Sequence, residues 1–516
     1  MQERMERKKN REREENRIRP FCINRFLPGS MTVFLALLLG GMTTLVCAGM
    51  LSVRMAGART QIQNGVDIGL FSVFGEYDRE LLERFDVLFL DAGGEGGLEL
   101  SSVYNEFRRY MDPVLTQNYQ TLVPGRGGFT GYRLAVDYQG EPFFQQAAAY
   151  MKELYAQNKA KRPQEKLDSA AAAELCEKGE QLEQENYLQR YQEEITKAEQ
   201  ESIRKAAENL ENDTLLTDGN TRTEVTAGEM LDPLQPVISF RETQGEQLLL
   251  PDTAGNTPGQ NPSGSLLSGR SLNQGMEIPD GFLPDDSAES IDLFDAYIME
   301  KMHSLEESAP SFPAFQIEYI LWGEEEDLQN IRKTARRILH FREGVNLETM
   351  LAERPLRESI SRLADSVCDS YLVKPDRSLV EQAVRYTWVY AESLLETRLL
   401  FSGQTLPLRK TASNMLLSLE QLETMPGLLA PPGSFWGGTA DGISYREILY
   451  VFLRKMDKQD KVIRTMDVVE QEMRLEDPSF CLDACICDAE VFVNVKANLR
   501  QNFEIRRIYG YSSREP

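Results

Sequence analysis

The sequence predicts an α+β protein that is tethered to a membrane by one N-terminal helix and ends in a mainly helical domain closed by a β-hairpin. Three patterns predict this fold. Met31–Val53 is a run of 23 residues without an ionisable side chain. Apolar residues recur at helical spacing between residues 291 and 456, and they alternate as in strands at 480–495 and 503–511.

The apolar run is long enough to cross a bilayer as a helix. Its 23 residues extend about 34 Å, whereas the hydrocarbon core is about 30 Å thick. The alternatives are a cleaved signal peptide, for which Ala56-Gly57-Ala58 supplies small residues, and a buried core helix. Because the apolar part of a signal peptide spans only about 7–15 residues, we favour a retained transmembrane helix.

The distribution of charge sets the expected orientation. Residues 1–30 contain nine Lys or Arg and five Glu, whereas only Arg54 and Arg59 are basic between the apolar run and Asp78. Basic flanks stay on the cytoplasmic side of a membrane. We therefore expect a basic cytoplasmic tail at residues 1–30, a single-pass location in the cell membrane and an extracytoplasmic bulk.

The composition excludes several functions. A formal net charge of −24 repels the phosphates of nucleic acids, so we expect no nucleic-acid partner. Seven cysteines are too sparse for a disulfide scaffold. Two histidines are few for a zinc hydrolase or a Ser-His-Asp enzyme. We therefore expect no enzymatic activity and no cofactor, and we identify no small-molecule substrate.

Residues 54–162 are expected to form a small membrane-proximal α+β unit. Ile62, Val66 and Leu70 continue the N-terminal helix with an apolar stripe. We interpret the glycine clusters Gly93–Gly97 and Gly125–Gly128 as a turn and a loop, because they lack the spacing of phosphate-binding loops. The helix is expected to run to residue 84 and to be followed by a strand at 85–91, a helix at 102–115, a strand at 132–138 and a helix at 142–161.

Two further segments precede the second domain. Residues 163–212 are rich in Ala, Gln and Glu, and their apolar residues step by threes and fours with one break. This pattern predicts a charged helical arm, which is either a coiled coil or a single solvated helix. Residues 213–290 are rich in Gly, Pro, Ser and Thr. We expect a disordered linker there, because such a segment buries too little apolar surface to offset chain entropy.

Residues 291–516 are expected to form a helical domain with a C-terminal β-hairpin. Prolines separate the helices, which we place at 291–304, 325–341, 347–351, 356–371, 379–401 and 444–456. The hairpin joins its two strands through a turn at 496–502.

Three cysteines and an aspartate lie close together near the C-terminus. Cys481, Asp483, Cys485 and Cys487 fall on one face of the first hairpin strand. Neighbouring positions of one strand do not surround a tetrahedral ion well, so we favour core thiols over a metal site. A disulfide between one of these cysteines and Cys368 stays open, because the pairing cannot be assigned from sequence.

Ionisable residues also cluster on the predicted helices. Glu392, Glu396 and Arg398 lie near a tryptophan, and Arg342-Glu343 lies on another helix. Because two carboxylates suffice for glycoside hydrolysis, a cell-wall hydrolase is one interpretation. We favour structural ion pairs, because the charges have opposite charges at helical spacing. No catalytic, cofactor or metal residue follows from the sequence.

The start of the apolar run carries a resemblance. Pro28-Gly29-Ser30-Met31 and the following residues resemble the start of TadE/TadG-type pseudopilins of Tad/Flp pilus systems. The resemblance implies that a membrane prepilin peptidase cuts between Gly29 and Ser30, and that the apolar helix later enters a pilus. Phe34 departs from the group, which usually has a glutamate at this position to register subunits in the filament.

The rest of the chain resembles an uncharacterised family of single-pass Firmicute membrane proteins, a domain of unknown function whose genes are associated with Tad/Flp pilus clusters. The matching stretches include Gln316–Gly323, Trp388–Ser393 and Pro407–Lys410. This resemblance implies an architecture and a setting, and it implies no chemistry.

These observations predict a non-enzymatic single-pass envelope protein that serves as a minor pseudopilin-like or assembly component of a Tad-like surface or secretion apparatus. Its expected partners are membrane lipid, through Met31–Val53, and other envelope or pilus-assembly proteins. An extracytoplasmic binding or sensing module is the alternative, and the cell-wall hydrolase is a third class.

Overall fold

The fold is given by a computed structural model of the chain. It describes residues 28–94, 97–116, 122–157, 159, 168–214, 234–243, 266–307, 313–422, 442–497 and 501–512. The chain divides into two compact units. Unit 1 comprises Met1–Gly69, Arg108–Gly127 and Val493–Ile505, and unit 2 comprises Leu70–Phe107, Gly128–Phe492 and Arg506–Pro516. Each unit therefore combines segments from both ends of the chain.

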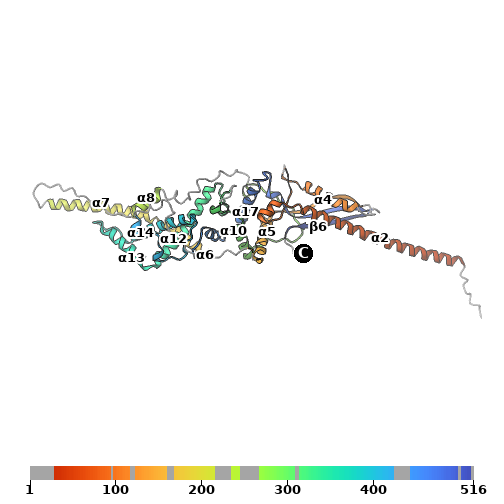
Figure 1. The fold of residues 1–516 in the computed structure, drawn as a ribbon, viewed down its shortest axis with the longest axis horizontal. Helices are drawn as coiled ribbons and strands as arrows, with labels where there is room; N and C mark the ends of the chain where they lie inside the picture. Colours follow the sequence, from red (N-terminus) through yellow and green to blue (C-terminus); the bar gives the residue numbers. More distant parts are fainter. Residues whose placement is uncertain are drawn as a thin grey trace, which may run out of the picture. The chain divides into compact units, whose positions relative to one another are not determined.

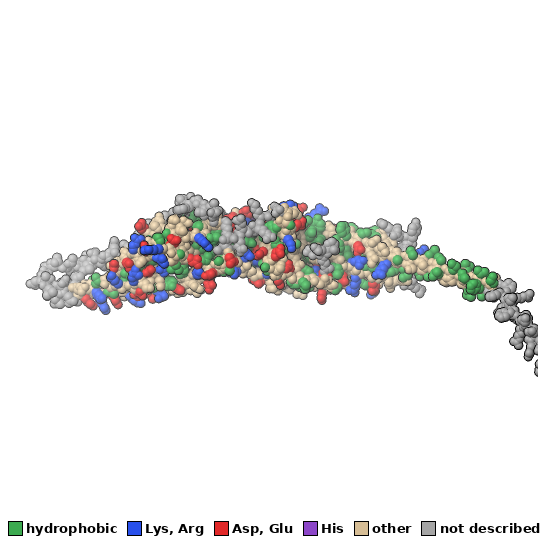
Figure 2. Space-filling view, turned by 90° about the horizontal axis from the view of Figure 1, so that it is seen from below, with side chains coloured by type: hydrophobic (Ala, Val, Ile, Leu, Met, Phe, Trp, Pro, Cys, Tyr) green, Lys and Arg blue, Asp and Glu red, His purple; other side chains and the backbone are tan. Residues whose placement is uncertain are grey.

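Helix α2 (Pro28–Phe74) confirms the predicted apolar helix (Figure 1). It is continuous over 47 residues, which corresponds to about 70 Å. Its span Met31–Phe74 is long and apolar enough to cross a membrane. All side chains from Met31 to Val53 are exposed, and Figure 2 shows this part of the helix as a hydrophobic stretch.

The second half of α2 is amphipathic, as expected. Ile62 and Val66 are fully buried and lie on one face of the helix. Within unit 1 this part packs on helix α4 (Leu100–Thr116), where the Gln61 side-chain amide donates to the Val114 carbonyl at 2.9 Å. The helix ends at Phe74 rather than at residue 84, and α3 (Arg79–Phe85) follows as a separate helix.

A four-stranded sheet is centred on β5 (Cys485–Ala497). Its order is β1–β5–β4, and β6 also pairs with β5. The other strands are β1 (Leu90–Asp91), β4 (Leu122–Leu134) and β6 (Gln501–Gly510), and a separate hairpin pairs β2 (Gly93–Gly94) with β3 (Gly97–Leu98). The predicted C-terminal hairpin is confirmed as β5–β6, which closes a mainly helical domain.

Three predictions for the first part of the chain are wrong in detail. The strand expected at 85–91 shortens to β1, because α3 occupies its start and Asp86 ends that helix at φ 53°. The strand expected at 132–138 ends at Leu134. The Gly125–Gly128 cluster lies inside β4 instead of in a loop. A side chain at Gly125 would meet the Asn494 carbonyl at 2.9 Å, so glycine is needed for the close approach of the two strands.

Helix α5 (Asp137–Ala156) packs in unit 2 against α10 (Ala288–Lys301) and α17 (Lys458–Met473). The contact with α10 is aromatic: the Phe143 and Phe144 rings lie 6.3 and 5.1 Å from the Phe294 ring. Helix α17 was not predicted, because its apolar residues are interspersed with charged residues that are themselves buried.

The expected helical arm forms two helices, α6 (Ser169–Gln184) and α7 (Tyr187–Thr214). They are separated at Asn186, which has a φ of 49°. Helix α6 packs against α12 (Asp327–Ala352), and α7 packs against α14 (Arg377–Phe401). The apolar stripe of α7 therefore covers the core of unit 2, and neither a coiled coil nor a fully solvated helix describes it.

The remaining predicted helices are present with shifted ends. The helices expected at 325–341 and 347–351 are one helix, α12, while α11 (Gln316–Trp322) was missed. Figure 1 shows α12 and α14 next to each other in the domain. The others are α13 (Arg354–Asp369) and α16 (Tyr445–Leu453), whereas the short α8 (Gln235–Thr243) was not predicted.

Part of the expected linker is folded. Residues 266–290 are described, and Leu267 and Ile278 are buried there. Arg270 anchors this segment through ion pairs with Glu470 and Asp483, each at 2.6 Å. The composition did not predict that this segment is folded, because polar contacts with residues distant in the chain hold it in place. The described part of residues 213–290 also includes α8, whereas residues 215–233 and 244–265 lie outside the described residues.

Helices α6 and α12 cross at two glycines. A Cβ at Gly179 would lie 2.2 Å from the His340 carbonyl oxygen, and a Cβ at Gly344 would lie 2.1 Å from the Leu175 carbonyl oxygen. Both neighbours are backbone atoms, which cannot rotate away. The two glycines therefore set the separation of the helices.

Replacing Gly344 by alanine should separate α6 from α12. We expect Gly344→Ala to lower the free energy of unfolding by about 1–3 kcal/mol, the usual cost of overpacking, even though alanine favours a helix over glycine by about 1 kcal/mol. Urea unfolding monitored by circular dichroism measures the change. Gly269→Ala is the control, because no atom lies within 4 Å of its added Cβ. Equal stability of the two variants would contradict the assigned crossing.

Candidate functional site

The predicted processing site lies at the start of α2. Gly29 and Ser30 belong to the first turn of this helix, directly after Pro28. Proline is favoured at this position because its missing N–H is not needed there. The anchor residues Met31 and Val53 have exposed fractions of 58% and 73%, so the surface between them is available to lipid or to another helix.

A cavity of about 680 Å³ in unit 2 lies next to an unusual turn. We call it the Tyr138 cavity. Its walls come from the end of β4, the start of α5, residues 271–278 and the first turns of α17. The size falls within the usual range of small-molecule sites. Tyr138 has an exposed fraction of 54%, and Met276 of 52%, so the cavity presents apolar surface to solvent.

Three consecutive residues at this cavity have left-handed backbone conformations. Tyr138, Gln139 and Gly140 have φ values of 51°, 64° and 83°. Each non-glycine residue in this region is strained, and such strain persists where the surroundings impose it. A side chain at Gly140 would meet the Val462 and Met466 side chains at 2.6 and 2.7 Å, so α17 also requires glycine there.

Charged residues fix the cavity walls. Arg133 pairs with Asp280 at 2.9 Å and with Asp488, and its guanidinium lies 3.9 Å from the centre of the Phe282 ring. Asp137 accepts from the backbone N–H of Gly275 at 2.9 Å. Burial raises the pKa of Asp137. Arg133 and Asp137 are therefore both bound within the protein, and they hold the cavity walls in place.

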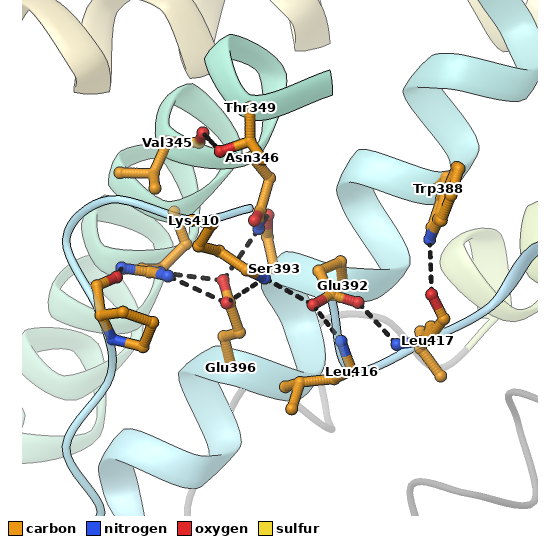
Figure 3. A network of polar contacts seen from close by, with 12 residues as sticks. Val345, Asn346, Thr349, Trp388, Glu392, Ser393, Glu396, Lys410, Leu416 and Leu417 are labelled. Atoms are coloured by element: carbon orange, nitrogen blue, oxygen red, sulfur yellow. Dashed lines mark hydrogen bonds and ion pairs between the residues drawn. The ribbon is translucent and has the colours of Figure 1, made fainter. Parts of the chain in front are cut away.

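The predicted carboxylate cluster forms a buried network between α12, α14 and the loop after α14 (Figure 3). Glu396 accepts from Arg342 Nε at 2.8 Å, from Lys410 Nζ at 2.7 Å and from Asn346 Nδ2 at 2.8 Å. Glu392 accepts from the same Lys410 Nζ at 2.5 Å and from the backbone N–H groups of residues 416 and 417. We call these residues the Glu396 network.

The network confirms buried ion pairs but not their predicted partners. The cations are Arg342 and Lys410, which are distant in sequence, instead of residues at helical spacing; Arg398 is not part of it. Burial alone would raise the pKa of Glu396, but the charges of Arg342 and Lys410 outweigh it and lower the pKa to about 2. Two positive and two negative side chains cancel, so the network holds the loop instead of offering a free acid or base.

The cysteine cluster is arranged differently from the prediction. Leu482–Ala484 forms a 3₁₀ turn, so Cys481 and Asp483 do not share the face of β5 with Cys485 and Cys487. Asp483 pairs with Arg270, and the two β5 thiols are fully buried. Burial raises the pKa of both thiols well above the usual value. The six cysteines that the structure describes, Cys368 included, are free thiols.

The two histidines lie in different surroundings. His303 is exposed, whereas His340 is buried on α12 with Nδ1 3.1 Å from Glu343 and Nε2 3.4 Å from Glu183. Within the described residues, no group of three or more His, Cys, Asp or Glu side chains is arranged to hold a metal ion.

One further buried acid was not singled out by sequence. Glu318 on α11 is fully buried, and it accepts from the Tyr445 hydroxyl at 2.5 Å and from the Leu305 N–H at 2.9 Å. Its second oxygen has no hydrogen-bond partner among the described residues. Burial raises the pKa of Glu318 to about 7. Nothing in the local pattern QIEYILW distinguishes this glutamate from an exposed one.

Comparison with known proteins gives a family but no activity. The model of a family of unknown function (DUF5702) matches residues 223–497. No curated protein and no solved structure matches the chain. The matched residues include the Glu396 network and two of the four wall segments of the Tyr138 cavity, residues 271–278 and the first turns of α17, and they do not include α2.

Removing the charge of Glu396 should leave the two buried cations with one carboxylate. We expect Glu396→Gln to lower the free energy of unfolding by about 3–5 kcal/mol at pH 7, the cost of breaking a buried ion pair. Because the folded pKa is depressed, the contribution of Glu396 is present above about pH 4.3 and is lost as the pH falls toward about 2. Urea unfolding at several pH values measures both effects. Glu358→Gln, in an exposed pair with Arg354, should change stability by less than about 1 kcal/mol.

Glu318 should give the opposite dependence on pH. Its folded pKa of about 7 exceeds the unfolded value of about 4.3, so the folded state holds a proton that the unfolded state lacks between these values. Stability should therefore fall as the pH rises from about 4 to 7 and stay reduced above it. We expect Glu318→Gln, which imitates the protonated form, to raise stability at pH 8 by on the order of 1–3 kcal/mol and to leave it unchanged near pH 4. A loss of stability at pH 8 would contradict this assignment.

Proposed function

The chain belongs to the family of unknown function DUF5702, and we propose that it is a non-enzymatic, single-pass envelope protein that acts as a pseudopilin-like or assembly component of a Tad-like surface or secretion apparatus. The observation that carries the proposal is α2, a continuous 47-residue helix whose first half exposes apolar side chains all round and whose second half buries one face. In the proposed topology, residues 1–30 are cytoplasmic and the acidic bulk is extracytoplasmic.

An exposed apolar helix has two suitable environments. One is the lipid of a membrane, and the other is a bundle of like helices at the centre of a filament. A pseudopilin-like protein uses the same surface in both, first as an anchor and then as a packing element. The Gly29–Ser30 bond at the start of α2 is the proposed processing site.

A stripe of small residues supports helix–helix packing by α2. Small residues recur at every fourth position along its apolar part: Ala36, Gly40, Thr44, Ala48, Ser52 and Ala56. Four-residue spacing of small side chains lets two membrane helices approach closely. No atom lies within 4 Å of a Cβ added at Gly40, so this surface is open.

The stripe of small residues can replace the glutamate that the resembling group has at the position of Phe34. Pseudopilins of the resembling group register subunits with a glutamate, whereas Phe34 is an apolar side chain with an exposed fraction of 63%. Close packing along the small residues supplies an alternative source of register. The proposal therefore places subunit alignment in shape complementarity rather than in charge.

The arrangement of buried acids supports a non-enzymatic role. The Glu396 network is neutralised and buried, and Asp137 and Asp483 hold backbone or arginine partners. A glycosidase needs two carboxylates that face a substrate across several ångströms. Among the described residues, the carboxylates named here hold structure instead.

Enlarging the stripe should prevent α2 from associating with another copy. We expect Ala48→Leu to abolish oxidative cross-linking through Cys47, an exposed thiol next to the stripe, and to reduce surface filaments or secretion in the producing cell. The measurement is non-reducing electrophoresis of membranes from cells that carry Cys47 as the sole cysteine, together with counts of filaments.

Val46→Leu is the matched control, because residue 46 lies on the opposite side of the helix from residues 44 and 48. It should leave both readouts unchanged. Unaltered filaments and secretion after deletion of the gene would contradict the proposed function. A mature N-terminus near Arg59 would contradict the anchor, whereas a start at Ser30 would support pilin-type processing.

A further inference from the structure

A second pocket in unit 2 differs from the rest of this acidic chain. It has a volume of about 430 Å³ and lies between α6, α8, α12 and α14. We call it the Arg332 pocket. Four cationic side chains line it: Arg241, Arg332, Lys333 and Arg336. The buried His340 and the carboxylates of Glu183 and Glu343 also line it.

The charges of the pocket do not cancel. Lys333 forms an ion pair with Glu324, so the three arginines face the two carboxylates, whereas the whole chain has a net charge of −24. A concave site of one sign concentrates its field inside the pocket and attracts small ions of the opposite sign. The Arg332 pocket is therefore a positive site on a protein whose remaining surface repels anions.

The internal carboxylate of the pocket is held loosely. Oxygen atoms of Glu183 lie 3.6 Å from Arg241, 3.5 Å from Arg336 and 3.4 Å from His340. Charge-assisted hydrogen bonds are usually about 2.7–2.9 Å long. This geometry contrasts with the Glu396 network, where Arg342 and Lys410 approach Glu396 to 2.8 and 2.7 Å. An incoming anion can therefore compete with Glu183.

Two of the cations are placed to receive a ligand. Arg332 is exposed at the pocket and forms no hydrogen bond or ion pair with another residue that the structure describes. Arg241 is held against the faces of Tyr386 and Tyr390, each 5.2 Å from its guanidinium carbon. Cation–π contacts of this kind hold a guanidinium in place, and a guanidinium fork matches a carboxylate or a phosphate.

We propose that the Arg332 pocket binds a small anionic molecule through a phosphate or carboxylate group. The volume suits a ligand of metabolite size. Arg332 and Arg336 lie one turn apart on one side of α12 and contact the oxyanion, while Leu339 and Tyr390 contact its less polar part. This inference does not depend on the proposed role in an envelope apparatus.

Binding to the full-length protein in detergent micelles tests the proposal. Inorganic phosphate, pyrophosphate and citrate are titrated separately by isothermal calorimetry at low salt. We expect saturable binding of pyrophosphate or citrate that weakens as salt is added. Binding of pyrophosphate alone identifies a phosphoryl ligand, and binding of citrate alone identifies a carboxylate ligand. No saturable binding of any of the three would overturn the proposal.

Variants locate the site. We expect Arg332→Gln with Arg336→Gln to weaken binding by about tenfold or more, because two charge-assisted hydrogen bonds are lost. Arg354→Gln, an exposed arginine on α13 in a surface pair with Glu358, is the control and should bind like the wild type. Arg332→Gln alone, at an exposed position, serves if the double variant does not fold. Equal affinity of the folded variants and the wild type would place the anion elsewhere and overturn the assignment.

Discussion

The fold of unit 2 depends on pairing buried carboxylates with cations that are distant in the chain. Asp295 meets Lys461, Glu470 meets Arg270, and Glu396 meets Arg342 and Lys410. An acidic chain cannot bury a lone carboxylate without a large loss of hydration. Each pair therefore ties two segments together, and the helices can pack only when the right segments meet.

These pairs explain where order occurs outside the regular elements. Residues 266–290 have the composition of a linker, yet Arg270 holds them to α17 through Glu470 and to the 3₁₀ turn before β5 through Asp483. The loop after α14 is held in the same way, because Lys410 and two backbone N–H groups bind Glu392. Few apolar contacts are needed when a segment supplies the counter-charge of a buried acid.

The sequence predicted the helices and strands better than the segments against which they pack. Apolar spacing located α2, α13, α14 and the β5–β6 hairpin, because burial imposes a period on each element. It missed α17, where charged residues such as Lys461 and Glu470 occupy buried positions. The left-handed turn at Tyr138 was also missed, because two of its three residues are not glycine.

The sequence likewise predicted single charged residues of the sites but not the residues that they contact. Glu392 and Glu396 were recognised as a charged cluster, but local spacing contains no information on Lys410 or Arg342. The Arg332 pocket combines residues from four helices, so no short motif marks it. A pattern along one helix reveals which side chains share a face, and only the packing of the helices shows which charges remain uncompensated.

The Glu396 network and the Arg332 pocket differ in how completely their charges are paired. In the Glu396 network every charge is matched at short distance and the exposed fraction of the glutamate is 1%. In the Arg332 pocket the cations outnumber the carboxylates, and Glu183 is held at 3.4–3.6 Å. Paired charges stabilise the fold but do not attract a ligand. The unpaired positive charge of the Arg332 pocket can therefore bind an anion.

The family match and the fold do not share boundaries. The matched residues 223–497 contain Asp488 and Lys458, whose partners Arg133 and Glu141 precede the match. They also contain β5, which pairs with β1 and β4 from the earlier part of the chain. A fragment confined to the match would leave these charges and strand edges exposed or unpaired. The folding unit therefore includes residues well before the match, among them Leu70–Phe74 at the end of α2.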